Sequence, residues 1–154
     1  MKPENIIIRR FESSDSIEVC DIIKRNLIKV NSKDYPAHII NNMCDLYTSE
    51  HIIEIAKARD IYVAELNGKL IGTASLDKHI ICAVYVNIDY HNRGIGRRLM
   101  CFIEEVAKHK SIKFLRLHAS LTSLNFYYTL GYKYIEELND PEAGKSTLVE
   151  KVLF

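Results

Sequence analysis

The residues most able to do chemistry lie within one stretch, VNIDYHNRGIGRR, at positions 86–98. Gly94 and Gly96 introduce a helical pattern there, and glycine lets backbone N–H groups approach a ligand closely. A helix N-terminus also presents unpaired N–H donors and a partial positive charge, which together attract anions. Cations oppose the helix dipole at this end by about 0.3–1 kcal/mol each, so a cluster of them favours a bound phosphate. Three arginines form such a cluster here: Arg93, Arg97 and Arg98.

The alternative is a tight turn whose glycines only shape the backbone and whose arginines face water. Two other phosphate-binding fingerprints are absent. Leu99 occupies the third glycine position of G-x-G-x-x-G, and no G-x-x-x-x-G-K-[ST] pattern occurs in the sequence. The turn therefore predicts neither a dinucleotide-binding fold nor a P-loop.

The elements around this turn follow from the pattern of apolar residues. Residues 80–86, IICAVYV, are continuously apolar, which is typical of a central strand buried on both faces. Residues 113–120 predict the next strand, and 122–130 predict a short helix that ends at Gly131 in a left-handed cap. Residues 94–110 predict a longer helix, because its apolar residues fall on one face: Ile95, Leu99, Phe102, Ile103 and Val106.

The N-terminal part of the chain predicts one strand followed by helices. Residues 5–11 are β-branched and apolar, as in a strand. Ser13 and Ser14 are candidate N-caps for the next helix. One or two further helices are expected over 36–58, the second beginning near Thr48. The buried face of the first helix is expected to comprise Ile17, Cys20, Ile23 (or Ile22), Leu27 and Val30.

Strands complete the predicted fold. A hairpin is expected at 61–66 and 69–76, because Asn67-Gly68 tolerates the positive φ values of a tight turn. Residues 1–154 therefore predict a single α/β (α+β) domain with a mixed central sheet of about 6–7 strands and about 4–5 helices. Two further segments are assigned to the end of this sheet: 132–136 and 147–153.

Two motifs resemble those of the GNAT superfamily of N-acetyltransferases. His91-Asn92-Arg93-Gly94-Ile95-Gly96 is similar to the family's [Q/R]-x-x-G-x-[G/A], with His91 in place of Gln or Arg. Val86 and Tyr90 match the longer pattern before it, whereas Ile88 stands where proline is common. Phe126-Tyr127, followed by Gly131-Tyr132, is similar to the family's second signature. Gly96 and Tyr127 lie 31 residues apart, which is the usual interval of helix, strand and helix.

The resemblance implies an acetyl-CoA-dependent N-acetyltransferase that acts by direct attack of an amine on the thioester, with no covalent enzyme intermediate. It implies that the central parallel strands splay apart and that a backbone N–H of residues 84–86 stabilises the developing oxyanion. Tyr127 is the implied general acid for the departing CoA thiolate. The implied cofactor-binding residues are Val84, Tyr85, Val86, His91, Asn92, Arg93, Gly94, Ile95, Gly96, Arg97, Arg98, Ser120 and Ser123.

Composition limits the partners that we expect. Lysine and arginine number 21 against 20 acids, so no general attraction to nucleic acid or to a membrane surface is predicted. No apolar run approaches the roughly 20 residues of a membrane span, and the start lacks a secretory signal. The cysteines are widely spaced, which predicts no metal site and suggests buried thiols in a reducing cytoplasm. They are Cys20, Cys44, Cys82 and Cys101.

The acceptor and the general base are not identified by any motif. The acceptor is an amine on a small molecule or a protein, and formation of a homodimer is left open. The acceptor cleft is expected between residues 13–58 and the C-terminal strands, where Glu50 and Glu54 either suit a cationic amine or simply face solvent.

Five side chains are candidates for the base, and each also has a structural interpretation; Cys82, for example, is expected to be a small buried apolar residue. Asp77 and His79 precede the central strand, and Glu65 flanks the hairpin turn. His118 is favoured as a half-buried, hydrogen-bonded histidine. Without a base, the alternative function is an acyl-CoA-binding module, and a phosphate- or nucleotide-binding protein of another fold is a third hypothesis.

Overall fold

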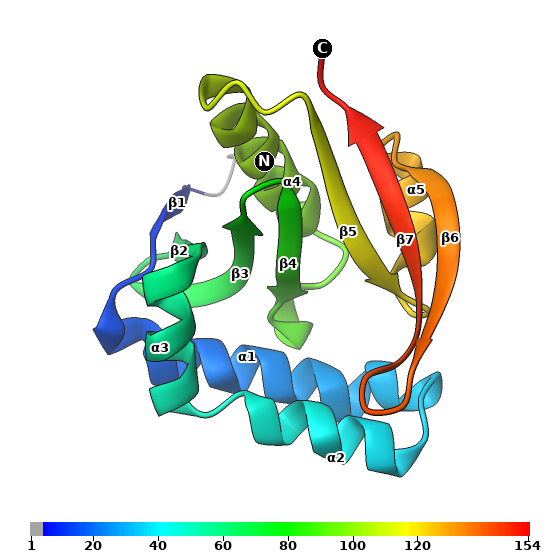
Figure 1. Cartoon of the computed structure of the whole chain (residues 1–154). Helices are drawn as coiled ribbons and strands as arrows, with labels where there is room; N and C mark the ends of the chain where they lie inside the picture. Colours follow the sequence, from blue (N-terminus) through cyan, green and yellow to red (C-terminus); the bar gives the residue numbers. More distant parts are fainter. Residues whose placement is uncertain (1–4) are drawn as a thin grey trace.

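The computed structural model describes residues 5–154 and contains one seven-stranded sheet (Figure 1). The strand order is β1-β2-β3-β4-β5-β7-β6, and every neighbouring pair is antiparallel except β4 and β5. The sheet is therefore mixed, as expected. The strands are β1 (Ile6–Arg10), β2 (Asp60–Leu66), β3 (Lys69–Asp77), β4 (Ile80–Val86), β5 (Phe114–Ser120), β6 (Lys133–Asp140) and β7 (Gly144–Val152).

Helices cover both faces of the sheet. One face carries α1 (Ser16–Lys29), α2 (Ala37–Leu46) and α3 (Ser49–Ala58), and the other carries α4 (Ile95–His109) and α5 (Leu124–Thr129). Short 3-10 turns lie at Ser13–Asp15, Asn31–Lys33 and Ile88–Tyr90. The GNAT-like α/β arrangement predicted from the sequence is thus confirmed in layers and in element order.

The two faces of the sheet have separate apolar cores because strand side chains alternate. In β2, Tyr62 and Ala64 join the core beneath α4, whereas Val63 joins the core beneath α1. Leu99 and Ile103 of α4 are completely buried in the first core, and Ile23 of α1 is 1% exposed in the second. Packing of helices against both faces of the sheet fixes the position of the central strands.

The central parallel strands separate soon after they begin. Only two residue pairs join β4 to β5, Ile80 with Arg116 and Ile81 with Leu117. Among residues 5–154, no strand pairs with β4 on its β5 side beyond Ile81. Figure 1 shows the two strands diverging toward the edge of the sheet beneath which α1 and α2 lie. The predicted splay is therefore present.

Local signals in the sequence were confirmed where backbone geometry decides them. Asn67 and Gly68 have φ values of 51° and 81°, as the hairpin requires. Gly131 has φ 94° and ends α5. The side chain of Thr48 accepts a hydrogen bond from the His51 N–H and caps α3.

Four expectations about burial and length were wrong. Ile17 is 75% exposed, because Val19 and Ile22 take the buried face of α1 instead. In β4 only Ile81 is buried, since the strand borders an open cleft rather than a neighbour. Cys101 is exposed on α4, so not all four thiols are buried. The last two strands, β6 and β7, are longer than the predicted segments.

Candidate active site at the split sheet

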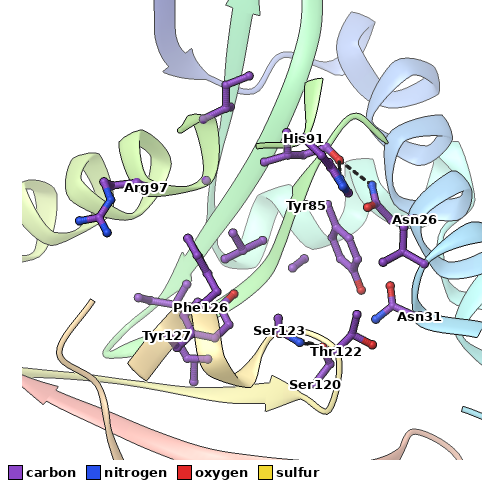
Figure 2. Close-up of a pocket in the computed structure, with 18 of the residues that line it drawn as sticks. Asn26, Asn31, Tyr85, His91, Arg97, Ser120, Thr122, Ser123, Phe126 and Tyr127 are labelled. Carbon is purple, nitrogen blue, oxygen red and sulfur yellow. Dashed lines mark hydrogen bonds between the residues drawn. The ribbon is translucent and has the colours of Figure 1, made fainter. Parts of the chain in front are cut away.

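A cavity of about 720 Å³ opens where β4 and β5 separate (Figure 2). Its wall includes the end of α1, the outer half of β4, the start of α4, the end of β5 and the start of α5. Twelve of the fourteen residues singled out from the sequence line it: Val84, Tyr85, Val86, His91, Asn92, Gly94, Ile95, Gly96, Arg97, Ser120, Ser123 and Tyr127.

The start of α4 presents unpaired donors to this cavity. Gly94 adopts φ +79°, and a Cβ built there would meet no atom within 4 Å, so the turn is open. The N–H of Arg98 donates to the Gly94 carbonyl and begins the helical ladder. Within residues 5–154, no acceptor engages the N–H groups of Ile95, Gly96 and Arg97. Three N–H groups and the helix dipole are therefore available to an anion.

The second glycine of the motif has a different role from the first. A Cβ at Gly96 would lie 3.1 Å from Cζ of Phe126. Gly96 therefore allows the first turn of α4 to approach α5. The two signatures recognised in the sequence meet at this contact.

Of the three arginines, only Arg97 lines the cavity. The Arg98 guanidinium donates to the carbonyl of Ile6 on β1 at 3.2 Å. The Arg93 guanidinium lies 5.0 Å from the centre of the Tyr90 ring. The structure therefore brings one of the three predicted cations to the cavity and directs the other two side chains elsewhere.

The substituted motif residue, His91, holds the end of β4. Its Nε2 lies 2.8 Å from the Val86 carbonyl oxygen and donates to it, because a carbonyl only accepts. Nδ2 of Asn26 donates to the same oxygen at 2.8 Å and ties α1 to the strand (Figure 2). Both lone pairs of the Val86 carbonyl are thus engaged within the protein.

Strand β4 bends at the cavity. Ala83 has φ 50°, and the β3–β4 register shifts between Thr73 and Ser75, which is the signature of a β-bulge. Beyond the bulge, Tyr85 projects into the cavity toward the side where Asn31 lies (Figure 2). Burial raises the pKa of the Tyr85 hydroxyl well above its ordinary range, so the phenol is neutral.

Tyr127 is 5% exposed and contacts Phe126 and Tyr132 edge-on, at ring-centre distances of 5.1 and 6.0 Å. Burial raises the pKa of its hydroxyl above the ordinary value, so the proton is retained at neutral pH. No other residue in the described part of the chain accepts a hydrogen bond from that hydroxyl. A protonated donor without a protein acceptor therefore lines the cavity.

Ser120 and Ser123 hydrogen-bond to one another, with their Oγ atoms 2.8 Å apart. The Ser123 N–H also donates to Ser120 Oγ at 3.2 Å. This pair closes the turn between β5 and α5 and leaves both serines in the cavity wall.

Most of the other candidates for a general base lie elsewhere. Glu65 pairs with Arg9 at 2.9 Å, and His79 packs edge-on against Phe114 at the far end of β4. Neither these nor Asp77 lines the cavity, and Glu50 and Glu54 also lie outside it. His118 does line the cavity. It is exposed rather than half-buried, and no hydrogen bond to a described residue engages it, so the favoured interpretation of His118 was wrong.

Within residues 5–154, no cluster of three or more His, Cys, Asp or Glu side chains has a metal-binding arrangement. No helix in that part of the chain has the length and apolar character needed to cross a membrane.

Three unpaired N–H groups of α4 and the Tyr127 phenol thus line one cavity at the split of the parallel pair. Comparisons with known proteins give the family of the chain. The family model described as "Acetyltransferase (GNAT) domain" matches residues 57–134, which is 78 of the 154 residues and includes both motifs. The chain therefore belongs to the GNAT acetyltransferase family.

Individual relatives agree with this assignment. The protein named Uncharacterized N-acetyltransferase YafP of Escherichia coli (strain K12) is 26% identical over 133 residues, covering 86% of this chain and 85% of that protein. A GCN5-related N-acetyltransferase structure from Rhodopseudomonas palustris superposes with a TM-score of 0.92 at 20% identity over 99% of both chains. The PaiA N-acetyltransferase of Thermoplasma acidophilum, solved with coenzyme A, gives 0.81 at 21% identity over 96% of this chain and 99% of that one. At these identities the two structures establish the fold.

Proposed function

We propose that this protein transfers the acetyl group of acetyl-CoA to a primary amine by direct attack, without a covalent enzyme intermediate. The observation that carries the proposal is that one cavity brings together three unpaired N–H groups of α4, the unpaired edge of β4 and the Tyr127 hydroxyl. The coenzyme A seen in the Thermoplasma structure is consistent with this assignment.

The start of α4 suits the pyrophosphate of acetyl-CoA. The open turn at Gly94 and the N–H groups of Ile95, Gly96 and Arg97 would hold the phosphate oxygens, and the Arg97 guanidinium would add charge. His91 and Asn92 shape the turn. Arg93 and Arg98 would contribute only to the local positive potential, because their side chains lie outside the cavity lining.

The outer half of β4 suits the pantetheine arm. Beyond Ile81 no described strand pairs with its β5-facing edge, so an extended amide chain can pair with this edge as an added strand. Val84 and Tyr85 would supply these contacts, and Val86 would contribute its N–H or its side chain, because its carbonyl is engaged. Ser120 and Ser123 would line the opposite side of the arm.

Acetyl-CoA supplies the acetyl group as an activated thioester. A backbone N–H of residues 84–86 would stabilise the negative charge that develops on the carbonyl oxygen. Tyr127 would donate a proton to the departing sulfur, since burial keeps its hydroxyl protonated. A thiol has a pKa near 8.5, so this donation would accelerate the reaction rather than be indispensable.

Release of free thiol from acetyl-CoA, measured with a panel of primary amines, tests the proposed function. Isothermal titration with CoA alone measures binding independently. We expect tight CoA binding and amine-dependent thiol release. Binding without turnover on any amine would identify an acyl-CoA-binding module instead, and equal affinity for CoA and ATP would identify a general phosphate-binding protein.

A further inference from the structure

A second cavity, of about 500 Å³, lies between α2 and the turn that joins β6 to β7. It shares part of its wall with the first cavity, and we call the shared residues the junction. An amine held in one cavity and a thioester held in the other can meet only at the junction. It consists of Asn31, Ala83, Tyr85, His118 and Ser120.

His118 brings an unengaged imidazole to the junction. Its neighbours Leu117 and Ala119 are 3% and 1% exposed in the core, so strand alternation places His118 on the opposite face of β5. Within the described chain, no hydrogen bond, ion pair or ring contact involves the imidazole of His118, whose backbone pairs with β7. By contrast, His91 is bonded to a carbonyl and His79 is packed against a ring.

Asn31 is the second polar side chain at the junction that lacks a partner. It is 9% exposed, and its backbone carbonyl accepts from the N–H groups of Asp34 and Tyr35. No other described residue hydrogen-bonds to its side-chain amide. The amide lines both cavities, where it is accessible to a ligand group at the junction.

The hydroxyl and thiol groups around His118 are poor proton acceptors. From β4, Cys82 and Tyr85 line the first cavity, and burial raises the pKa of both. Burial likewise raises the pKa of Tyr35 and Tyr47 on the α2 side and of Tyr127 on α5. All five groups therefore carry their protons at neutral pH.

The charged groups of the second cavity come from the β6–β7 turn. The N–H groups of Ala143 and Glu142 hydrogen-bond to Asp140 and lower the pKa of its carboxyl, which makes it a weak base. Lys145 is the other charged side chain there. The remaining titratable groups line the first cavity near α4, away from the junction: Tyr90, His91 and Arg97.

The rest of the second cavity is largely apolar. One carboxylate and one ammonium at its edge leave no surplus negative charge for a polycation. Glu50 and Glu54 lie outside this cavity as well. Its apolar and aromatic wall includes Leu27, Ile39, Ile40, Met43, Tyr47 and Leu138.

From these observations we infer that the second cavity binds the acceptor, that the acceptor is a primary amine with one positive charge on an apolar body, and that His118 is the general base. This inference rests on the proposed acetyl transfer. His118 accepts a proton from the ammonium, directly or through one water, while Asn31 orients the nitrogen. The nitrogen lone pair then forms the bond to the acetyl carbon, the carbon–sulfur bond breaks, and the sulfur keeps the electron pair and receives the Tyr127 proton. The nitrogen releases its second proton to water, water returns one proton to Tyr127, and His118 gives its proton to solvent, so that one proton is released per turnover.

The role of His118 is tested by His118→Gln with hexylamine as acceptor, following kcat/KM from pH 6 to 10. An imidazole ordinarily changes charge between pH 5 and 8, whereas an alkylammonium has a pKa of about 10.4. The wild type should therefore reach a plateau below pH 9. The variant should be about 10²–10⁴-fold slower at pH 7 and should rise about tenfold per pH unit, because only the free amine reacts.

His79→Gln is the matched control, since His79 lies at the far end of β4 and outside both cavities. It should keep the wild-type rate and profile. A His118→Gln variant with the wild-type rate and plateau would overturn the assignment. Titration with CoA checks that each variant is folded and should give the wild-type affinity.

The acceptor class is tested with propylamine, butylamine and hexylamine against spermidine. For the alkylamines, kcat/KM should rise about fourfold for each methylene buried. Spermidine should be the poorest substrate. A best rate with spermidine, or no dependence on chain length, would contradict the inferred class, while thiol release with any amine would still support acetyl transfer. Absence of both CoA binding and thiol release would instead contradict the proposed function.

Discussion

The two cavities of this protein meet at β4 but are built by different means. The larger one presents unpaired backbone groups at the start of α4 and along the edge of β4, which we propose as its main means of recognition. The smaller one is lined by side chains from α1, α2, β6 and β7, which are far apart in the sequence. Recognition by backbone needs glycine and tight spacing, whereas recognition by side chains needs only matching shape. Recognition by backbone therefore leaves a motif in the sequence, whereas recognition by side chains does not.

The largest effect is expected at the chemical centre of the first cavity. Tyr127→Phe retains the ring contacts with Phe126 and Tyr132 but removes the proton donor. We expect kcat to fall about 10²–10⁴-fold, with little change in KM for acetyl-CoA. Stopped-flow detection of thiol release measures this. Tyr128→Phe is the control because Tyr128 is 39% exposed and outside both cavities; a loss in that variant instead would refute the assignment.

The next largest effect is expected on CoA affinity, when a negative charge is placed at the open turn. Gly94→Asp and Gly94→Asn have side chains of similar size, and both residues tolerate positive φ better than most. The aspartate places a negative charge beside the phosphates, so CoA affinity should fall about 10–100-fold relative to the asparagine variant. Isothermal titration measures both. Equal affinities would show that no phosphate lies near Gly94.

Substitution of Gly96 tests whether this glycine is needed for helix packing as well as for ligand binding. Because Cζ of Phe126 lies 3.1 Å from a Cβ built there, Gly96→Asp disturbs the α4–α5 contact as well as the phosphate. Gly96→Ala should therefore lower the melting temperature, by about 4 °C for each kcal/mol of stability lost. Thermal melts of Gly96→Ala and Gly94→Asn compare the two glycines directly, and a larger drop at position 94 would contradict this division of roles.

A smaller effect is expected from the arginines. Arg97→Ala should weaken CoA binding by about 1–2 kcal/mol, since a charge-assisted contact is lost. That loss should shrink in high salt, because exposed charges are screened. Arg98→Ala should weaken binding less, as its guanidinium contacts β1. Titrations at low and high salt test this order, and an Arg98 effect exceeding that of Arg97 would contradict it.

The smallest effect is expected from removing the Tyr35 hydroxyl, in the wall of the second cavity. The Tyr35 hydroxyl donates to the Lys145 carbonyl at 2.6 Å and accepts from the Leu121 N–H at 2.9 Å, which joins the α1–α2 connection to both walls. Tyr35→Phe should raise KM for the amine a few-fold, by about 1 kcal/mol, and leave CoA affinity unchanged. A changed CoA affinity would show that the two cavities are coupled through this hydroxyl.

The sequence by itself determined the order of elements and the turn at Gly94, whereas the split of the sheet was implied only by the family resemblance. The order and the turn depend on local rules, namely the two-residue period of strands, the 3.6-residue period of helices and the positive φ of glycine. It also placed Tyr127 correctly in the cavity wall, because the second motif lies at a constant interval from the first.

Only the tertiary structure decided which polar side chains face the cavities. The His118 side chain was expected to be hydrogen-bonded. The divergence of β5 from β4 instead leaves its imidazole at the junction, with no hydrogen bond to a described residue. Arg97 and Arg98 are adjacent in sequence, but successive helical positions point in different directions, so Arg97 lines the cavity and Arg98 contacts β1. Arg93 precedes the helix and lies over the Tyr90 ring. The acceptor cavity joins residues more than a hundred positions apart, such as Leu27 and Leu138. Their proximity depends on long-range packing, which no local pattern encodes.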